Sequence, residues 1–492
     1  MRKFNLLITL LTGMVISSCS DFLEQLPDQR TELDSPEKVA ELLSSAYPKA
    51  NYITFIEAMS DNSADKGILQ TEIINSEPWQ FHDVPSRDFD TPDFYWQAAY
   101  AAIAAANIAL EAIDNAAEQE LYSASRGEAL IARAYAHFML VTLYSAIYDP
   151  ATADSDPGIP YVTEPEKVVI KKYERRTVAY VYEQIEKDIV EGLPLINDAS
   201  FQDGAPKYHF TQMAAHAFAA RFYLFKQDYQ KTVDHANLAF ATEDIIPYLR
   251  PINSLEYRSL EPLVKLAEYT KATQPANLLL VEAPSLWGRS LAGYRYGFNF
   301  KLLQTLVWGP NPANGVWTYA YYGNETFLLT PKFREHFVRI DPTANIGTPY
   351  NIIPLLTAEE LLFNRAEANV MLGNYETALK DLNDFASTRI IVDELNYPYY
   401  DPIYNRLTLK KIRDFYQTVD TRSSMLSTIL DFKRIEFVTE GIRWFDILRH
   451  KIPVVHESFD KKTTLTLGPN DPRRLLQIPQ EAQSSGIELN PR

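Results

Sequence analysis

The sequence has very few cysteines and no cluster of basic residues. Cys19 is the single cysteine in 492 residues, which excludes an intramolecular disulfide and a zinc site made of several cysteines. The formal net charge is −17, and the sequence contains no long run of Lys and Arg. Because binding to a phosphate backbone needs clustered positive charge, we expect no nucleic-acid partner.

Long apolar runs are also scarce, and the clearest one lies at residues 4–16. It follows Arg2 and Lys3 and ends just before Cys19. A basic start and a short apolar segment are typical of a secretory signal, which is too short to span a bilayer as a stable helix. The residues up to Cys19 are similar to a bacterial lipobox. We therefore expect residues 1–18 to be a signal peptide, Cys19 to carry lipid that holds the protein on a membrane, and residues 19–34 to be a polar tether.

Motifs for catalysis and for metal binding are missing as well. The eight histidines include no HExxH motif and no pair at i,i+4 spacing. Asp149, Asp154 and Asp156 lie in one segment, but they lack the spacing and the closing Glu of an EF-hand. We therefore expect no catalytic residue, no metal and no cofactor. A surface glycoside hydrolase would need two facing carboxylates, and the 64 acidic residues leave that alternative open.

The clearest structural pattern is a helical hairpin at residues 359–385. Apolar residues recur at helical spacing on both sides of Gly373, which predicts two antiparallel helices. Ala366 and Ala378 are small where these helices would cross, as in a tetratricopeptide repeat. Such a hairpin cannot bury its apolar face alone, so we expect related units elsewhere in the chain.

Further helical segments support a mostly α fold. Ser35 and Pro36 predict the start of the first helix of the folded part, because they suit an N-cap and the first helical position. The other predicted helical segments lie at residues 94–113, 125–148, 176–196, 211–224, 229–241 and 426–450. Between about 246 and 354 the helical period fades and Gly, Pro and aromatic residues become frequent. That insertion is predicted to be a loop-rich, ligand-binding part mounted on the helices.

Several motifs, in order along nearly the whole chain, resemble those of the SusD/RagB family of outer-membrane nutrient-binding lipoproteins. They are Cys19 with residues 20–23, the runs 133–135 and 143–144, the run 353–356 leading into 365–368, the segments 434–437 and 440–449, and residues 478–479.

This resemblance implies a SusD-like fold at residues 35–492, with four tetratricopeptide-like helix pairs and an irregular ligand-binding part. It also implies a lipid-anchored protein of the outer membrane, facing the cell exterior. Such a protein captures oligosaccharides and delivers them to a SusC-like TonB-dependent outer-membrane transporter. Two alternatives stay open: a peptide-binding, RagB-like member, and a structural docking lid of the transporter.

The candidate ligand-binding residues are aromatic side chains in loops. Flat aromatic faces can cover the apolar C–H surface of sugar rings, while amide or charged groups bind the hydroxyls. By resemblance to starch-binding relatives, Trp317, Tyr294, Tyr296 and Trp79 are predicted to stack on sugars, with ordinary packing as the alternative. The polar candidates are Asn314, Arg295 and Asp83.

Five charged residues near the C-terminus raise the question of catalytic carboxylates. Glu440 and Arg443, and likewise Asp446 and Arg449, are spaced at i,i+3 on a predicted helix, and Glu436 lies one turn before them. We interpret the set as a structural charge network that fixes this helix to the scaffold.

Overall fold

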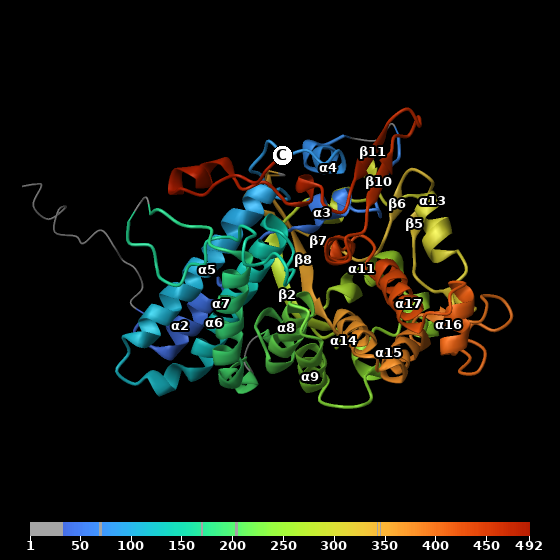
Figure 1. Ribbon diagram of the computed structural model, residues 1–492, viewed down its shortest axis with the longest axis horizontal. Helices are drawn as coiled ribbons and strands as arrows, with labels where there is room; N and C mark the ends of the chain where they lie inside the picture. Colours follow the sequence, from blue (N-terminus) through green and yellow to red (C-terminus); the bar gives the residue numbers. More distant parts are fainter. Residues whose placement is uncertain (1–32, 68–70, 169–170, 202–204, 342, 345) are drawn as a thin grey trace, which may run out of the picture.

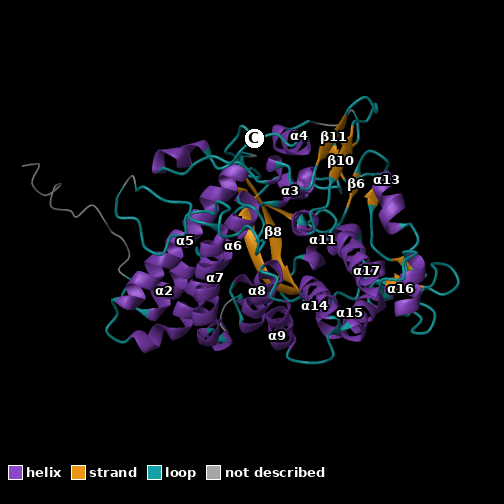
Figure 2. Ribbon diagram, viewed as in Figure 1, coloured by secondary structure: helices purple, strands orange, loops and turns teal. Residues whose placement is uncertain are grey.

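The computed structural model describes residues 33–67, 71–168, 171–201, 205–341, 343–344 and 346–492. Helices dominate it, and they form an arc along the lower edge of the molecule in Figures 1 and 2. Short strands and loops gather at the opposite edge, together with the C-terminus. The predicted signal peptide, Cys19 and nearly all of the predicted tether lie outside the described residues. Within the described ranges, no helix combines the length and the apolarity that a membrane crossing requires.

The helical arc is built largely from helices that are neighbours in sequence and pack side by side. Among the described residues the arc contains four such pairs, as the resemblance implies, and α7 (Val178–Gly192) adds a further helix against α6. The pairs are α5 (Pro92–Asp114) with α6 (Ser123–Tyr144), α8 (Gln212–Phe225) with α9 (Tyr229–Phe240), α14 (Ala358–Leu372) with α15 (Tyr375–Ser387), and α16 (Leu409–Phe415) with α17 (Thr421–Glu436).

Small residues and polar caps explain why these helices form and cross closely. Ala366 and Ala378 are fully buried where α14 meets α15, which confirms the predicted hairpin. Thr357 caps α14 by accepting a hydrogen bond from the Glu360 N–H, and Gly373 ends the helix at φ 85°. The first helix, α2 (Pro36–Leu43), begins as predicted, with a Ser35 side-chain cap.

A three-stranded antiparallel sheet lies at the centre of the molecule, in the order β2–β8–β7. Its strands are β2 (Asn277–Pro284), β7 (Glu335–Arg339) and β8 (Gly347–Thr357). The prediction of a merely loop-rich insertion at 246–354 was therefore incomplete, because that insertion supplies most of this sheet. Pro349 and Pro354 lie within β8, and prolines are typical of loops because they lack a backbone donor.

The predicted single helix at 426–450 is wrong, because the chain breaks between α17 and α18 (Ile442–Arg449). Thr439 and Gly441 take positive φ values of 69° and 75° in the break. Their N–H groups donate to the carboxylate of Glu57 on α3 (Ile53–Met59), at 2.8 and 2.9 Å. A side chain distant in sequence thus accepts hydrogen bonds from a backbone turn that interrupts the helix.

The remaining elements are short. They are α4 (Ile73–Trp79), α10 (Leu255–Ser259), α11 (Pro262–Tyr269), α12 (Trp287–Ser290), α13 (Phe300–Leu302), β1 (Ala64–Asp65), β3 (Tyr296–Gly297), β4 (Val316–Trp317), β5 (Tyr322–Gly323), β6 (Leu328–Leu329), β9 (Ile390–Ile391), β10 (Val454–Glu457) and β11 (Thr464–Leu467).

Candidate functional site

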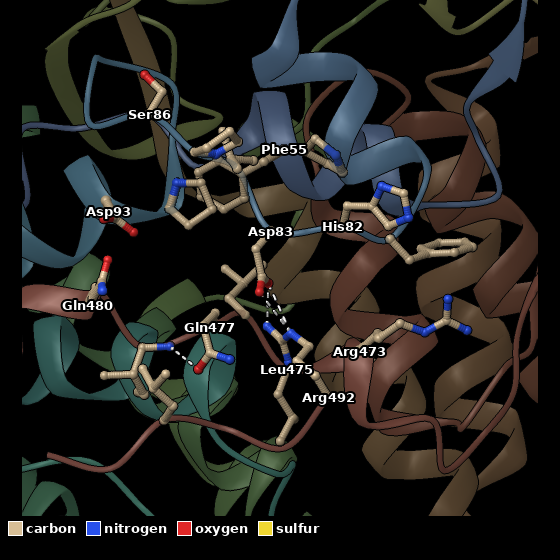
Figure 3. A pocket seen from close by; sticks show the side chains of 18 of the residues that line it. Phe55, His82, Asp83, Ser86, Asp93, Arg473, Leu475, Gln477, Gln480 and Arg492 are labelled. Carbon is tan, nitrogen blue, oxygen red and sulfur yellow. Dashed lines mark hydrogen bonds and ion pairs between the residues drawn. The ribbon is translucent and has the colours of Figure 1, made fainter. Parts of the chain in front are cut away.

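A cleft of about 670 Å³ opens between residues 78–93 and the C-terminal segment 473–492 (Figure 3). Phe55 and Met59 line it from α3, and Leu476 lines it from the C-terminal segment. All three of these side chains are buried, so the cleft has an apolar floor. Its two walls come from parts of the chain that are almost 400 residues apart.

The loop that forms the first wall is held at both of its ends. Phe81 has a φ of 59°, and its ring stacks on His456 with the ring centroids 4.8 Å apart. Asp90 has a φ of 66°, is fully buried, and accepts hydrogen bonds from Asn51 Nδ2 and Ser285 Oγ at 2.9 and 2.7 Å. Burial raises the pKa of Asp90, although these hydrogen bonds oppose the increase. The wall is thus preformed by contacts with the core.

Two ion pairs join this loop to the C-terminal segment across the mouth of the cleft. Arg492 Nη2 lies 2.6 Å from Asp83 Oδ1, as Figure 3 shows, and Arg87 pairs with Glu481. Both pairs are solvent-exposed to a large degree. Each therefore adds little to stability, roughly 0–1 kcal/mol. They place carboxylates and guanidinium groups at the rim.

Asp93 is a charged group in the cleft with unused bonding capacity. It lies in the first turn of α5, is half-buried, and makes no hydrogen bond to another described residue. Burial raises the pKa of Asp93; Arg87 opposes this increase, and the carboxylates of Glu481 and Asp83 add to it. Its two oxygens can therefore accept hydrogen bonds from a bound molecule.

Amide side chains add to this hydrogen-bonding surface. Gln480 and Gln483 line the cleft and are exposed. Gln477, by contrast, is occupied, because its Oε1 accepts from the N–H groups of Ile478 and Asn490. An apolar floor beneath a carboxylate and free amides suits a ligand with many hydroxyl groups.

Two of the predicted stacking residues lie together, but they stack on each other. The rings of Trp79 and Tyr296 are 4.3 Å apart, and His456 stacks on Trp79 at 4.9 Å. Trp79 ends α4, directly before the cleft loop, and is 4% exposed, while Tyr296 is 8% exposed. This cluster therefore supports the cleft wall in the described conformation and offers no open ring face.

The other two predicted stacking residues lie elsewhere in the core. Tyr294 packs near Trp287, with ring centroids 6.2 Å apart. Trp317 lies on β4, and the ring of Phe432 meets it edge-on at 4.8 Å. Both residues are at most 3% exposed. A role of these aromatic residues in ligand contact stays a prediction, and it would require the covering side chains to move.

The polar candidates have three different environments. Asn314 is exposed, with a φ of 53°, at the end of a turn that is closed by the hydrogen bond from its N–H to the Asn311 carbonyl. Arg295 is engaged by Asp65 through two hydrogen bonds of 2.7 and 2.8 Å. Asp83 reaches the rim of the cleft, where it pairs with Arg492. The C-terminal wall was missed by the sequence analysis, since no motif there indicates a site.

The charged set near the C-terminus forms buried ion pairs, which supports its structural interpretation. Burial alone would raise the pKa of Glu436, but Arg389 and Lys332 hold it at about 2. Glu440 pairs with Lys332, and Arg443 pairs with Asp61, so these two residues contact distant segments rather than each other. Across the described ranges, no group of three or more His, Cys, Asp or Glu side chains is arranged to hold a metal ion.

Two protein-family sequence models match the chain. One, described as starch-binding and associating with the outer membrane, matches residues 21–224. The other, described as the SusD family, matches residues 309–485. Together they span more than half of the chain. No curated protein sequence matches it significantly.

Several solved structures share the fold. A SusD superfamily protein from Bacteroides thetaiotaomicron is 19% identical, with a TM-score of 0.66, over 93% of this chain and 100% of that chain. A putative sugar binding protein from Bacteroides vulgatus is 20% identical, with a TM-score of 0.68, over 94% of this chain and 99% of that chain. A SusD-like carbohydrate binding protein from Bacteroides vulgatus is 18% identical, with a TM-score of 0.64, over 92% and 96% of the two chains.

Proposed function

The chain belongs to the SusD family, and we propose that it binds oligosaccharides in the cleft between residues 78–93 and 473–492. The description of one matching model as starch-binding supports this proposal, as do the names of two similar structures as sugar- or carbohydrate-binding proteins. Binding without cleavage is the proposed activity, because the matching model and these similar structures are described as binding proteins.

The observation that carries this proposal is the free carboxylate of Asp93 above an apolar floor. A sugar ring has an apolar C–H face and several hydroxyl groups around its edge. Val84, Leu475 and Leu489 line the cleft with partly exposed side chains and can contact the apolar face, while Asp93 and the amide of Gln480 accept or donate hydrogen bonds at the edge. His82, whose side chain is 59% exposed, adds a flat ring at the rim.

We further propose that lipid on Cys19 attaches the protein to the outer membrane, with its folded part on the cell exterior. The proposed organisation is a signal peptide at residues 1–18, a tether at 19–34 and a SusD-like domain at 35–492. In that position the protein would pass its ligand to a SusC-like TonB-dependent transporter. One matching family model is described as associating with the outer membrane, and this description supports the proposed location.

A binding panel with a cleft variant tests the proposed site. The full chain is titrated with starch, other polysaccharides, oligosaccharides and peptide mixtures, alongside Asp93→Asn. Asp114→Asn is the matched control, because Asp114 lies at the other end of the same helix and outside the cleft. A hydrogen bond to a charged group contributes about 1.5–3 kcal/mol, so Asp93→Asn should weaken oligosaccharide binding roughly 10- to 100-fold.

The same panel separates the alternatives. The guanidinium and carboxylate groups at the rim would also suit a charged peptide, and saturable binding of peptides alone would support the RagB-like alternative. A folded protein that binds neither class would point to a docking lid. Oligosaccharide binding that Asp93→Asn leaves unchanged would place the site outside this cleft.

A further inference from the structure

Two histidines face each other across the hairpin formed by α8 and α9. His216 lies in the second turn of α8, and His235 lies in the middle of α9. Their Nδ1 atoms are 3.0 Å apart, and both side chains are partly exposed. The hairpin lies at the edge of the molecule opposite the C-terminus in Figure 1, so the pair is remote from the proposed cleft.

We propose that His216 and His235 bind one divalent transition-metal ion of the kind that imidazole favours, Cu²⁺ before Ni²⁺ or Zn²⁺. Two nitrogen ligands at about 2.0–2.1 Å from one ion lie roughly 2.9 Å apart at a right angle and about 3.4 Å apart at a tetrahedral angle. The Nδ1–Nδ1 separation of 3.0 Å falls within this interval. Only a small movement of the two rings would be needed.

The chemistry of the pair allows a metal ion to take the place of the hydrogen between the two Nδ1 atoms. Two neutral imidazoles can make the observed contact only if one Nδ1 carries hydrogen and the other offers its lone pair. Neither Nε2 has a hydrogen-bond partner among the described residues, so either ring can carry its hydrogen on Nε2. Both Nδ1 lone pairs would then point at the ion, and no proton would be released.

A neighbouring aromatic ring holds one of the two imidazoles in place. Tyr223 stacks on His235 at 5.2 Å, with the rings nearly parallel. Lys231, in the same helix as His235, is engaged by Glu186 at 2.8 Å. The imidazole of His235 is thus an ordered ligand.

Two protein ligands make a simple chelate, in which water completes the coordination. The described residues contain no third His, Cys, Asp or Glu placed to join this pair. Because α9 also packs against α14, an ion held here would link both helices of the hairpin and stiffen the middle of the scaffold. The inference is independent of glycan binding.

The test is a titration of the untagged full chain, freed of metal by EDTA, with Cu²⁺ and then with Zn²⁺. We expect one ion per chain at micromolar Cu²⁺, a spectroscopic signature of two equatorial nitrogens in electron paramagnetic resonance, and weaker binding of Zn²⁺. His216→Ala and His235→Ala should each lower the Cu²⁺ affinity roughly tenfold or more, because each leaves a single imidazole.

His336→Ala is the matched control, since His336 is an exposed histidine paired with Glu282. It should bind Cu²⁺ as the wild type does. His216→Gln serves as a second variant if an alanine substitution disturbs the hairpin, and circular dichroism checks that each variant is folded. Cu²⁺ binding that the double variant His216→Ala/His235→Ala retains, or binding only at millimolar metal, would overturn the proposal.

Discussion

Glu57 should make the stability of this protein depend on pH in a defined window. Its side chain is 2% exposed and accepts hydrogen bonds from the N–H groups of Thr439 and Gly441. Burial raises its pKa from 4.5 to about 7, and the two backbone hydrogen bonds and Lys332 limit the increase. The folded protein therefore keeps a proton on Glu57 at pH values where the unfolded chain has released it.

The sign and size of the effect follow from this difference. Below pH 4.5 both states are protonated, and the contribution to folding is present in full. As pH rises from 4.5 to about 7, the free energy of unfolding falls, because ionisation favours the unfolded chain. One pKa unit corresponds to about 1.4 kcal/mol, so the loss across this window is on the order of 3 kcal/mol.

Urea unfolding of the wild type and Glu57→Gln at a series of pH values measures this contribution. The variant cannot ionise, so the difference in free energy of unfolding between the two proteins should change by about 3 kcal/mol across the window. The cost of the lost hydrogen bond is the same at every pH and does not affect this change. Glu376→Gln, at an exposed position, is the control. Parallel curves for wild type and Glu57→Gln would refute the reasoning.

Three further substitutions probe the core. Arg389→Met removes the arginine that pairs with buried Glu436 and one of the two arginines that pair with buried Glu359, and it should cost about 3–5 kcal/mol in urea unfolding; a loss below 1 kcal/mol would contradict the buried network. Gly441→Ala forces a side chain into a φ of 75° and against Ile56, 2.8 Å away, so it should lose about 1–3 kcal/mol by the same assay. Trp317→Ala should lower the free energy of unfolding by about 3–5 kcal/mol, and an unchanged melting temperature would show that its ring is not packed against Phe432.

The parts of the fold that the sequence predicted correctly are those that depend on residues close together in the chain. A small residue such as Ala366, a cap such as Ser35 and a helix end such as Gly373 act within one or two turns of the chain. The break before α18 could not be predicted in this way, because its hydrogen bonds go to Glu57, more than 380 residues earlier. Strand β8 was missed for a related reason, since its pairing with β2 outweighs the presence of two prolines.

The candidate site shows the same limit more sharply. Asn314 ends a turn, and the next residue, Gly315, lies so close to Ile390 that a Cβ there would be 2.3 Å from it; β4 pairs with β9 immediately after it. That pairing, rather than the turn, places Trp317 in the core, so a loop rich in aromatic residues did not by itself indicate which rings face solvent.

Asp93 does not belong to any sequence motif that indicates a binding site. It becomes a candidate because the C-terminal segment folds over the start of α5 and encloses its carboxylate without giving it a partner. Contacts between distant segments thus determine which polar groups remain available to a ligand, and a binding site of this kind is predicted better from the folded chain than from its residue types.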